Sequence, residues 1–218
     1  MIAGSLEDGV AAYERHDFAT AMALLRPLAD RGNAAAQLNV GLMYAFGGGV
    51  PQDKARGIGW YRKAAEQGNA EAEARLADRY EAGNGVSRDY ATALYWARKS
   101  AEQSNPLGET TLGLMYLAGQ GVPRDPRRAA EWIEKGARQG NVDAQMTLGL
   151  MYERGWGMPR DDVHAYAWYD VAISGVPASW ASVTNSPTDL RDRIASQMNA
   201  GEIAEARRLA IELRPKHR

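Results

Sequence analysis

The sequence predicts an all-α fold, a right-handed α-solenoid (superhelix) built of antiparallel helix pairs. Two observations predict it: one segment recurs at a constant step of 36 residues, and apolar residues on both sides of its glycines recur at helical spacing. The segment reads GLMYAFGGGVPQD from residue 41, ADRYEAGNGVSRD from residue 77, GLMYLAGQGVPRD from residue 113 and GLMYERGWGMPRD from residue 149. A repeat of this length indicates an array that grows along one axis.

Each window of 36 residues contains two helical stretches with a glycine-containing turn between them. In the third window we expect the first helix near residues 107–118 and the second near 126–138. Asparagine opens each window and suits a helix N-cap, glycine suits the left-handed end of the first helix, and aspartate suits the N-cap of the second. These residues are Asn33, Asn69, Asn105 and Asn141; Gly47, Gly83, Gly119 and Gly155; and Asp53, Asp89, Asp125 and Asp161.

The glycine-rich turns are not a nucleotide site. They follow a helix and not a strand, and no Gly-Lys-Ser/Thr follows, so neither a dinucleotide fingerprint nor a P-loop is present, and we expect no cofactor. A small residue also recurs inside the first helix, where glycine costs about 1 kcal/mol relative to alanine, which predicts close approach of the second helix. These small residues are Gly41, Ala77, Gly113 and Gly149, and the tryptophans expected to pack between repeats are Trp60, Trp96, Trp132 and Trp168.

Composition excludes several classes of protein. A formal net charge of −1 argues against nucleic-acid binding, and the absence of cysteine excludes disulfides and thiolate metal sites. No apolar run is long enough to span a bilayer. The start of the chain does not resemble a signal peptide, so a cytoplasmic protein and an exported one whose signal was removed both stay open. A monomer is favoured.

Catalytic and metal-binding motifs are also missing from the sequence. His16, His164 and His217 belong to different units and lack the spacing of a helical metal pair. Asp161 and Asp162 beside His164 are explained as well by a helix cap and a solvated side chain as by an acid–base cluster. We therefore assign no catalytic residue and no metal site.

The repeated motif resembles a known family. The stretch AQLNVGLMYAFGGGVPQDKARGIGWYRKAAEQG resembles a Sel1-like repeat, a 36-residue relative of the tetratricopeptide repeat. The departures are Ala77 in place of glycine, Met158 in place of valine, and Val163 with His164 in the fourth window. The resemblance covers four windows, 33–68, 69–104, 105–140 and 141–176.

The flanks are less regular than the windows. Residues 5–32 are similar to a degenerate helix pair, with Asp17 and Phe18 at the turn. Residues 177–218 are expected to form capping helices, with Asn199 as an N-cap and Glu202 completing a capping box. Five apolar residues there should bury against Trp168 and its neighbours: Ile194, Met198, Ile203, Ala206 and Ala210.

The resemblance implies an adaptor that binds a peptide or helix of another protein in a concave groove lined by the first helices. We expect a partner with Leu- or Phe-type anchors and some positive charge, although burial of the leucines between helices stays open. The expected groove residues are Leu38, Leu42, Phe46, Asp78, Glu81, Leu114, Leu117, Met146, Leu150, Glu153 and Arg154.

The alternative is an enzyme. Some cysteine-rich Sel1-like relatives are associated with beta-lactam binding and weak hydrolysis. Those relatives carry a disulfide in each repeat and this chain has no cysteine, which counts against the enzyme.

Overall fold

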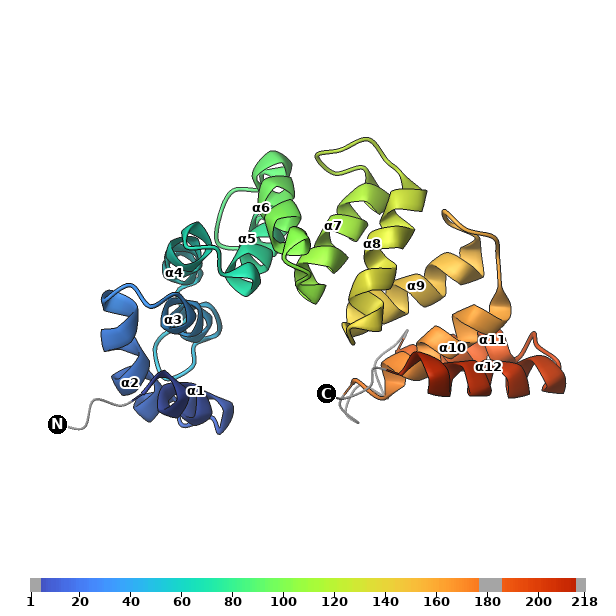
Figure 1. Cartoon of the computed structure of the whole chain (residues 1–218), viewed down its shortest axis with the longest axis horizontal. Helices are drawn as coiled ribbons and strands as arrows, with labels where there is room; N and C mark the ends of the chain where they lie inside the picture. The colour runs from blue at the N-terminus through green and yellow to red at the C-terminus, as the bar shows by residue number, and fades with distance from the viewer. Residues whose placement is uncertain (1–4, 177–185, 215–218) are drawn as a thin grey trace. The chain divides into compact units, whose positions relative to one another are not determined.

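The computed structural model describes residues 5–176 and 186–214, and these residues form twelve α-helices and no strand (Figure 1). The chain divides into two compact units, Met1–Gly108 and Glu109–Arg218, here called the N-terminal and C-terminal units. Each unit is described by itself. The all-α repeat fold expected from the 36-residue period is confirmed.

The N-terminal unit consists of helices that each pack on the next along the chain, as the blue to green part of Figure 1 shows. The helices of one repeat, α3 with α4 and α5 with α6, make the most extensive contacts. The bounds are α1 Leu6–Glu14, α2 Phe18–Asp30, α3 Ala34–Phe46, α4 Lys54–Glu66, α5 Ala70–Ala82 and α6 Tyr90–Glu102.

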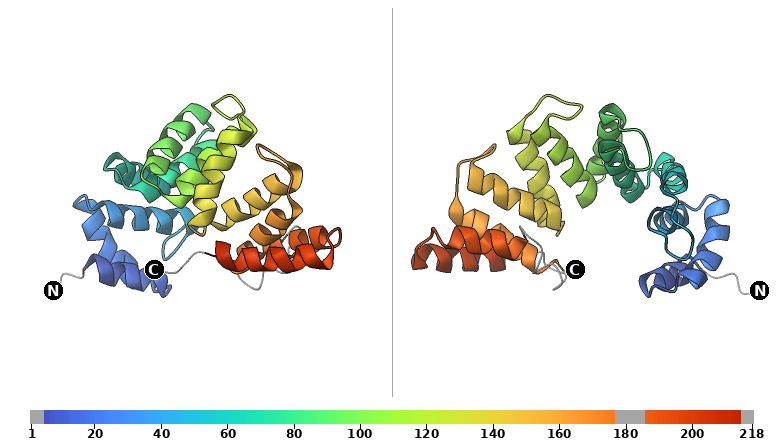
Figure 2. Two further views of the ribbon diagram at one scale, coloured as in Figure 1. Left: turned by 45° about the vertical axis from the view of Figure 1, so that its right-hand side comes forward. Right: turned by 180° about the vertical axis from the view of Figure 1, so that it is seen from behind.

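The C-terminal unit continues the pattern and ends differently. Here α10 contacts α9 and also both of the last helices, which lie beside it in the two views of Figure 2. The bounds are α7 Pro106–Ala118, α8 Pro126–Arg138, α9 Val142–Arg154, α10 Asp162–Ile173, α11 Pro187–Ala195 and α12 Ala200–Leu213. The helices expected near 107–118 and 126–138 are α7 and α8. Residues 177–185 and 215–218, part of the expected capping segment, lie outside the described residues.

Local capping explains where the helices begin and end. Asn33 Oδ1 accepts a hydrogen bond of 2.9 Å from the backbone N–H of Ala36, and Asp53 Oδ1 accepts one of 2.9 Å from that of Arg56. Gly47 ends α3 with φ of 79°, in the left-handed region that glycine adopts without strain. Each of these roles recurs at the equivalent residues of the other three repeats, which confirms the predicted caps.

The small residues inside the first helices face a large residue of the second. A methyl group at Gly41 would lie 2.7 Å from the ring of Tyr61, one at Gly113 would lie 2.7 Å from Ile133, and one at Gly149 would lie 2.6 Å from Tyr169. The large partner is thus the residue after each tryptophan, which the sequence pattern did not identify. In the second repeat Ala77 replaces the glycine, and the residue 20 positions later (77 + 20 = 97) is a small one, Ala97. In the second repeat both facing residues are therefore small, so the two helices can still approach closely.

The tryptophans of the second helices contribute to the core. Trp60 is buried in a cluster with residues of α1, α2 and α3, and its ring lies 5.2 Å from the Arg26 guanidinium and 4.2 Å from the Lys63 ammonium. Trp168 is fully buried. Trp96 is half-buried against the cluster of α3, α4 and α5, and Trp132 is half-buried, so the packing role expected of all four residues is seen most clearly at Trp60 and Trp168. Among residues 5–176 and 186–214, no helix combines the length and the apolar character needed to cross a bilayer.

Candidate partner-binding surfaces

In the N-terminal unit the expected apolar residues form one row on α3. Leu38, Leu42 and Phe46 follow at steps of four, which places them on one face of the helix. Leu38 and Leu42 are half-buried and pack against the cluster formed by α3, α4 and α5, whereas Phe46 is 58% exposed. The row therefore runs from the core to the surface, and it ends in an exposed aromatic ring.

One polar residue of α5, Arg79, lies over that ring. The Arg79 guanidinium lies 5.7 Å from the centre of the Phe46 ring, and Arg79 Nε lies 3.5 Å from a carboxylate oxygen of Asp78. Asp78 and Glu81 are both half-buried. This surface thus offers an aromatic ring beside a cation that is paired with a carboxylate, and Glu81 lies on the same helix.

In the C-terminal unit the expected apolar residues lie on α7 and α9. Leu114 is 39% exposed and Leu117 is half-buried on α7, and Met146 and Leu150 are half-buried on α9. Met146 and Leu150 are four residues apart and share one face. None of the eleven expected residues is fully buried.

Glu153 is already engaged within the chain. Its carboxylate accepts a hydrogen bond of 2.8 Å from the hydroxyl of Tyr169 and two of 2.8 and 2.9 Å from Arg193 of α11. Burial and the hydrogen bond to Glu153 raise the pKa of Tyr169. Glu153 thus links α9, α10 and α11, so a cationic partner would have to compete with Arg193 for it.

A cavity of about 270 Å³ opens beside this carboxylate, and we call it the arginine cleft. It is lined by Glu153, Arg154, Arg160, Arg193, Ile194 and Gln197. The side chain of Arg160 forms two hydrogen bonds with Asp162, 3.0 and 2.9 Å, which raise the pKa of its guanidinium. The last expected site residue, Arg154, thus lies in a mainly cationic cavity.

Comparison with known proteins identifies the family. The Sel1 repeat profile matches residues 34–69, 70–105, 108–141 and 142–175. The chain belongs to the Sel1 repeat family. No curated protein matches the chain in sequence.

Solved structures of Sel1 repeat proteins have the same fold. A Sel1 repeat protein from Oxalobacter formigenes is 27% identical, with a TM-score of 0.65, over 90% of this chain and 87% of that one. The protective antigen c5321 of uropathogenic Escherichia coli, described as having an SLR fold, is 26% identical with a TM-score of 0.56, over 96% of this chain and 53% of that one. The immunity protein Pa5087 from Pseudomonas aeruginosa shares the fold at 16% identity and a TM-score of 0.55, over 98% of this chain and 89% of that one.

The acid–base cluster considered for this Sel1 repeat protein has structural roles. Asp161 caps α10 by accepting from the backbone N–H of His164, and its other oxygen lies 2.7 Å from His164 Nδ1. The His164 ring also stacks on Tyr152 at 4.9 Å. Within the described ranges no three His, Cys, Asp or Glu residues are grouped so that they could hold a metal ion.

Sequence reasoning missed Arg160, Tyr169 and Arg193 as neighbours of the expected surface. Arg193 is 40 residues from Glu153 and lies in a segment without the repeat period, so no spacing rule connects the two. Tyr169 could have been found from the sequence, because a tyrosine, Tyr61, also follows the tryptophan at the equivalent position of the first repeat.

Proposed function

We propose that this Sel1 repeat protein is an adaptor that binds a peptide or helix of a partner protein on the exposed faces of its first helices. Sel1 repeat proteins are generally scaffolds for protein interaction. The observation that carries the proposal is the row on α3, where Phe46 is 58% exposed beyond two leucines that reach into the core. An exposed apolar patch with a polar rim supports partner binding.

The chemistry of the surface favours an amphipathic segment. A helix or extended peptide would place an apolar side chain against Phe46 in the N-terminal unit, or against Leu114 and Leu150 in the C-terminal unit. Such anchors recur at one-turn spacing in helix-in-groove recognition. The charged residues beside them, such as Asp78 and Arg79, would set the orientation of the segment more than its affinity.

We further propose that residues 177–218 act as a terminal cap and that residues 5–32 are a degenerate first helix pair. In support, Ile194 and Ala206 form a cluster with Ala165, Tyr166 and Tyr169 of α10, and Met198 and Ile203 pack against it. The last apolar face of a repeat array requires such a cover. Removal of residues 188–218 should expose that face, lower thermal stability and cause aggregation.

Capture experiments with the immobilised full chain test the adaptor function. Phe46→Glu tests the N-terminal unit, and Leu114→Glu with Leu150→Glu tests the C-terminal unit. Proteins retained by the unmodified chain and identified by mass spectrometry should be lost from at least one of these variants, while the melting temperature moves little.

Ile211→Glu on α12 is the matched control, because Ile211 is 68% exposed and lies outside both expected surfaces. It should retain the partner. Retention of the same proteins by every variant would contradict the proposal, and so would a large fall in the melting temperature of Leu114→Glu.

A further inference from the structure

We propose that the arginine cleft of the C-terminal unit receives an acidic side chain of the partner segment that lies along α9. This proposal rests on the adaptor function, and it specifies the charge of the partner residue that binds at the C-terminal end of α9. It differs from the sequence expectation, in which Glu153 was to meet a positively charged partner.

Charge is the first argument for this cleft. Three guanidinium groups line it. Arg154 ends α9, Arg160 lies in the turn before α10, and Arg193 belongs to α11. Their side chains are 54%, 60% and 43% exposed, respectively. Glu153, the one carboxylate among the lining residues, is only 13% exposed. Arg160 is paired with Asp162 and Arg193 with Glu153, so Arg154 is the lining cation without a hydrogen-bonded carboxylate among the described residues.

Unused hydrogen-bonding capacity is the second argument. Arg193 is bound by Glu153, and Arg160 is bound by Asp162. Arg154, in contrast, makes only an ion pair of 3.7 Å with Glu153 among the described residues. A guanidinium presents five N–H donors in a planar fork that a carboxylate can accept in pairs. A lysine from a partner would find the oxygens of Glu153 already bound by Tyr169 and Arg193, and it would be repelled by the guanidinium of Arg154.

Position along α9 is the third argument, and it selects an internal acidic residue over a chain terminus. Leu150 lies one turn before Arg154 on the same face of the helix. A bound helix that places an apolar residue on Leu150 would bring a carboxylate three or four residues away to the cleft, because one turn rises about 5.4 Å. The expected partner motif is an apolar residue followed or preceded by Asp or Glu at that spacing.

Selection from a library of random displayed peptides on the full-length protein tests this motif. Enriched peptides should carry Asp or Glu three or four positions from a large apolar residue. A synthetic peptide from that set should bind about tenfold more weakly to Arg154→Glu, by fluorescence anisotropy, because a charge-assisted bidentate contact is lost. Arg154→Lys should give an intermediate affinity, since it keeps the charge but not the fork.

Arg208→Glu is the matched control, because Arg208 is exposed on α12 and makes the same change in net charge. It should change the affinity less than about twofold, and both variants should melt close to the unmodified chain. An amidated C-terminus on the peptide should leave binding unchanged; if binding needs a free terminus, the assignment to a side chain is wrong.

The outcomes separate this inference from the adaptor function. Enrichment of lysine- or arginine-rich peptides would overturn it, as would acidic peptides that bind Arg154→Glu as tightly as the unmodified chain. If binding is lost in Leu150→Glu but not in Arg154→Glu, the surface binds peptides and only the role of the cleft fails. Failure to enrich any peptide would count against both.

Discussion

Tyr61 and Tyr169 occupy equivalent positions of the first and fourth repeats (169 − 61 = 108, three steps of 36), yet their hydroxyl groups differ. Both side chains are fully buried. The hydroxyl of Tyr169 donates to Glu153, whereas that of Tyr61 has no hydrogen-bond partner within the part of the chain that the structure describes. The residue equivalent to Glu153 in the first repeat (153 − 108 = 45) is Ala45.

This difference shows that the repeat specifies its packing and its polar contacts separately. Both rings fill the space opposite a glycine, so the helix pair keeps one geometry in both units. Only the C-terminal unit adds a carboxylate that links the hydroxyl to the next helix. In the N-terminal unit, burial raises the pKa of Tyr61 to about 12.

A buried position of the first helices also differs in its polar contacts from one repeat to the next. Gln37 Nε2 donates to the carbonyl of Ala29 at 3.1 Å, and the equivalent Gln145 donates to Ala137 at 3.1 Å. Glu73 stands at this position in the second repeat. Its Oε2 accepts from Gln103 at 2.7 Å, but its Oε1 has no hydrogen-bond partner among the described residues.

Glu153→Ala should have the largest effect, because it removes the feature that distinguishes the two units. It leaves the buried hydroxyl of Tyr169 without an acceptor and frees Arg193, so we expect a loss of about 2–3 kcal/mol in the free energy of unfolding. Urea denaturation followed by circular dichroism measures this.

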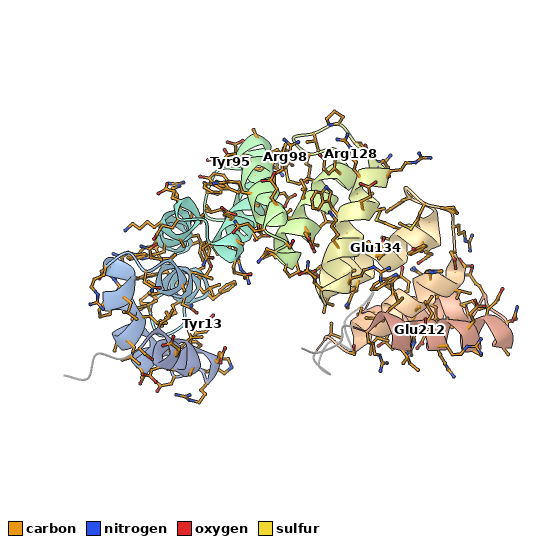
Figure 3. All side chains as sticks on the ribbon, viewed as in Figure 1. Tyr13, Tyr95, Arg98, Arg128, Glu134 and Glu212 are labelled. Carbon is orange, nitrogen blue, oxygen red and sulfur yellow. The ribbon has the colours of Figure 1, made fainter. Side chains whose placement is uncertain are left out.

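The control for that variant is Glu134→Ala on α8, labelled in Figure 3. Glu134 pairs with Arg138 at 2.6 Å, but both side chains are exposed, so the cost should stay below about 0.5 kcal/mol. Equal losses in the two variants would show that the buried link contributes nothing special.

Tyr169→Phe and Tyr61→Phe should have the next largest difference in the free energy of unfolding. Tyr169→Phe removes a hydrogen bond to a charged group and should cost about 1.5 kcal/mol, whereas Tyr61→Phe removes a hydroxyl without a partner and should be neutral or slightly stabilising. The same denaturation experiment compares them. A matching loss in both variants would mean that the hydroxyl of Tyr61 is bonded in solution.

Ala45→Glu would install the missing carboxylate in the first repeat. Gly57 faces Ala45 at close range, since a methyl group there would lie only 3.0 Å from Ala45 Cβ, so the longer side chain requires a small shift of the helix pair. We expect a gain of at most about 1 kcal/mol, which should disappear in the Tyr61→Phe background. A gain that persists there would have another origin.

Glu73→Gln should give the smallest effect, and one that depends on pH. Burial raises the pKa of Glu73, against the opposing influence of Lys99 and Gln103, while Glu102 raises it further. The folded protein therefore binds this proton more tightly than the unfolded chain does, so Glu73 stabilises the fold below its ordinary pKa and that stability is lost as the pH rises through the folded pKa.

The variant should therefore melt higher than the unmodified chain at pH 7, with a difference that shrinks toward pH 4. We expect its amide to donate to the carbonyl of Ala65, which is the equivalent of the Ala29 carbonyl that accepts from Gln37. Melting curves across this pH range measure the effect. A difference that is constant with pH would show that Glu73 does not titrate on unfolding.

The period, the helix ends and the turns of this protein follow from local patterns of residues. These features depend on residues three or four positions apart, such as Asn33 with Ala36 and Asp53 with Arg56, so a single window contains all the information needed. The expectation that small residues inside the first helices mark close helix packing was also confirmed. The eleven expected surface residues remain a prediction of partner binding.

Which of those side chains are exposed to a partner depends on how the helices pack. Leu42 and Phe46 lie on one face of α3, but packing against α4 and α5 covers the first and leaves the second exposed. Glu153 was expected to line the partner-binding groove, and it is bound by Tyr169 and by Arg193 from 40 residues away. The repeat fixes where the backbone runs, but a polar side chain is satisfied by whichever atoms the neighbouring helices bring within hydrogen-bond distance, and no spacing along the chain encodes that.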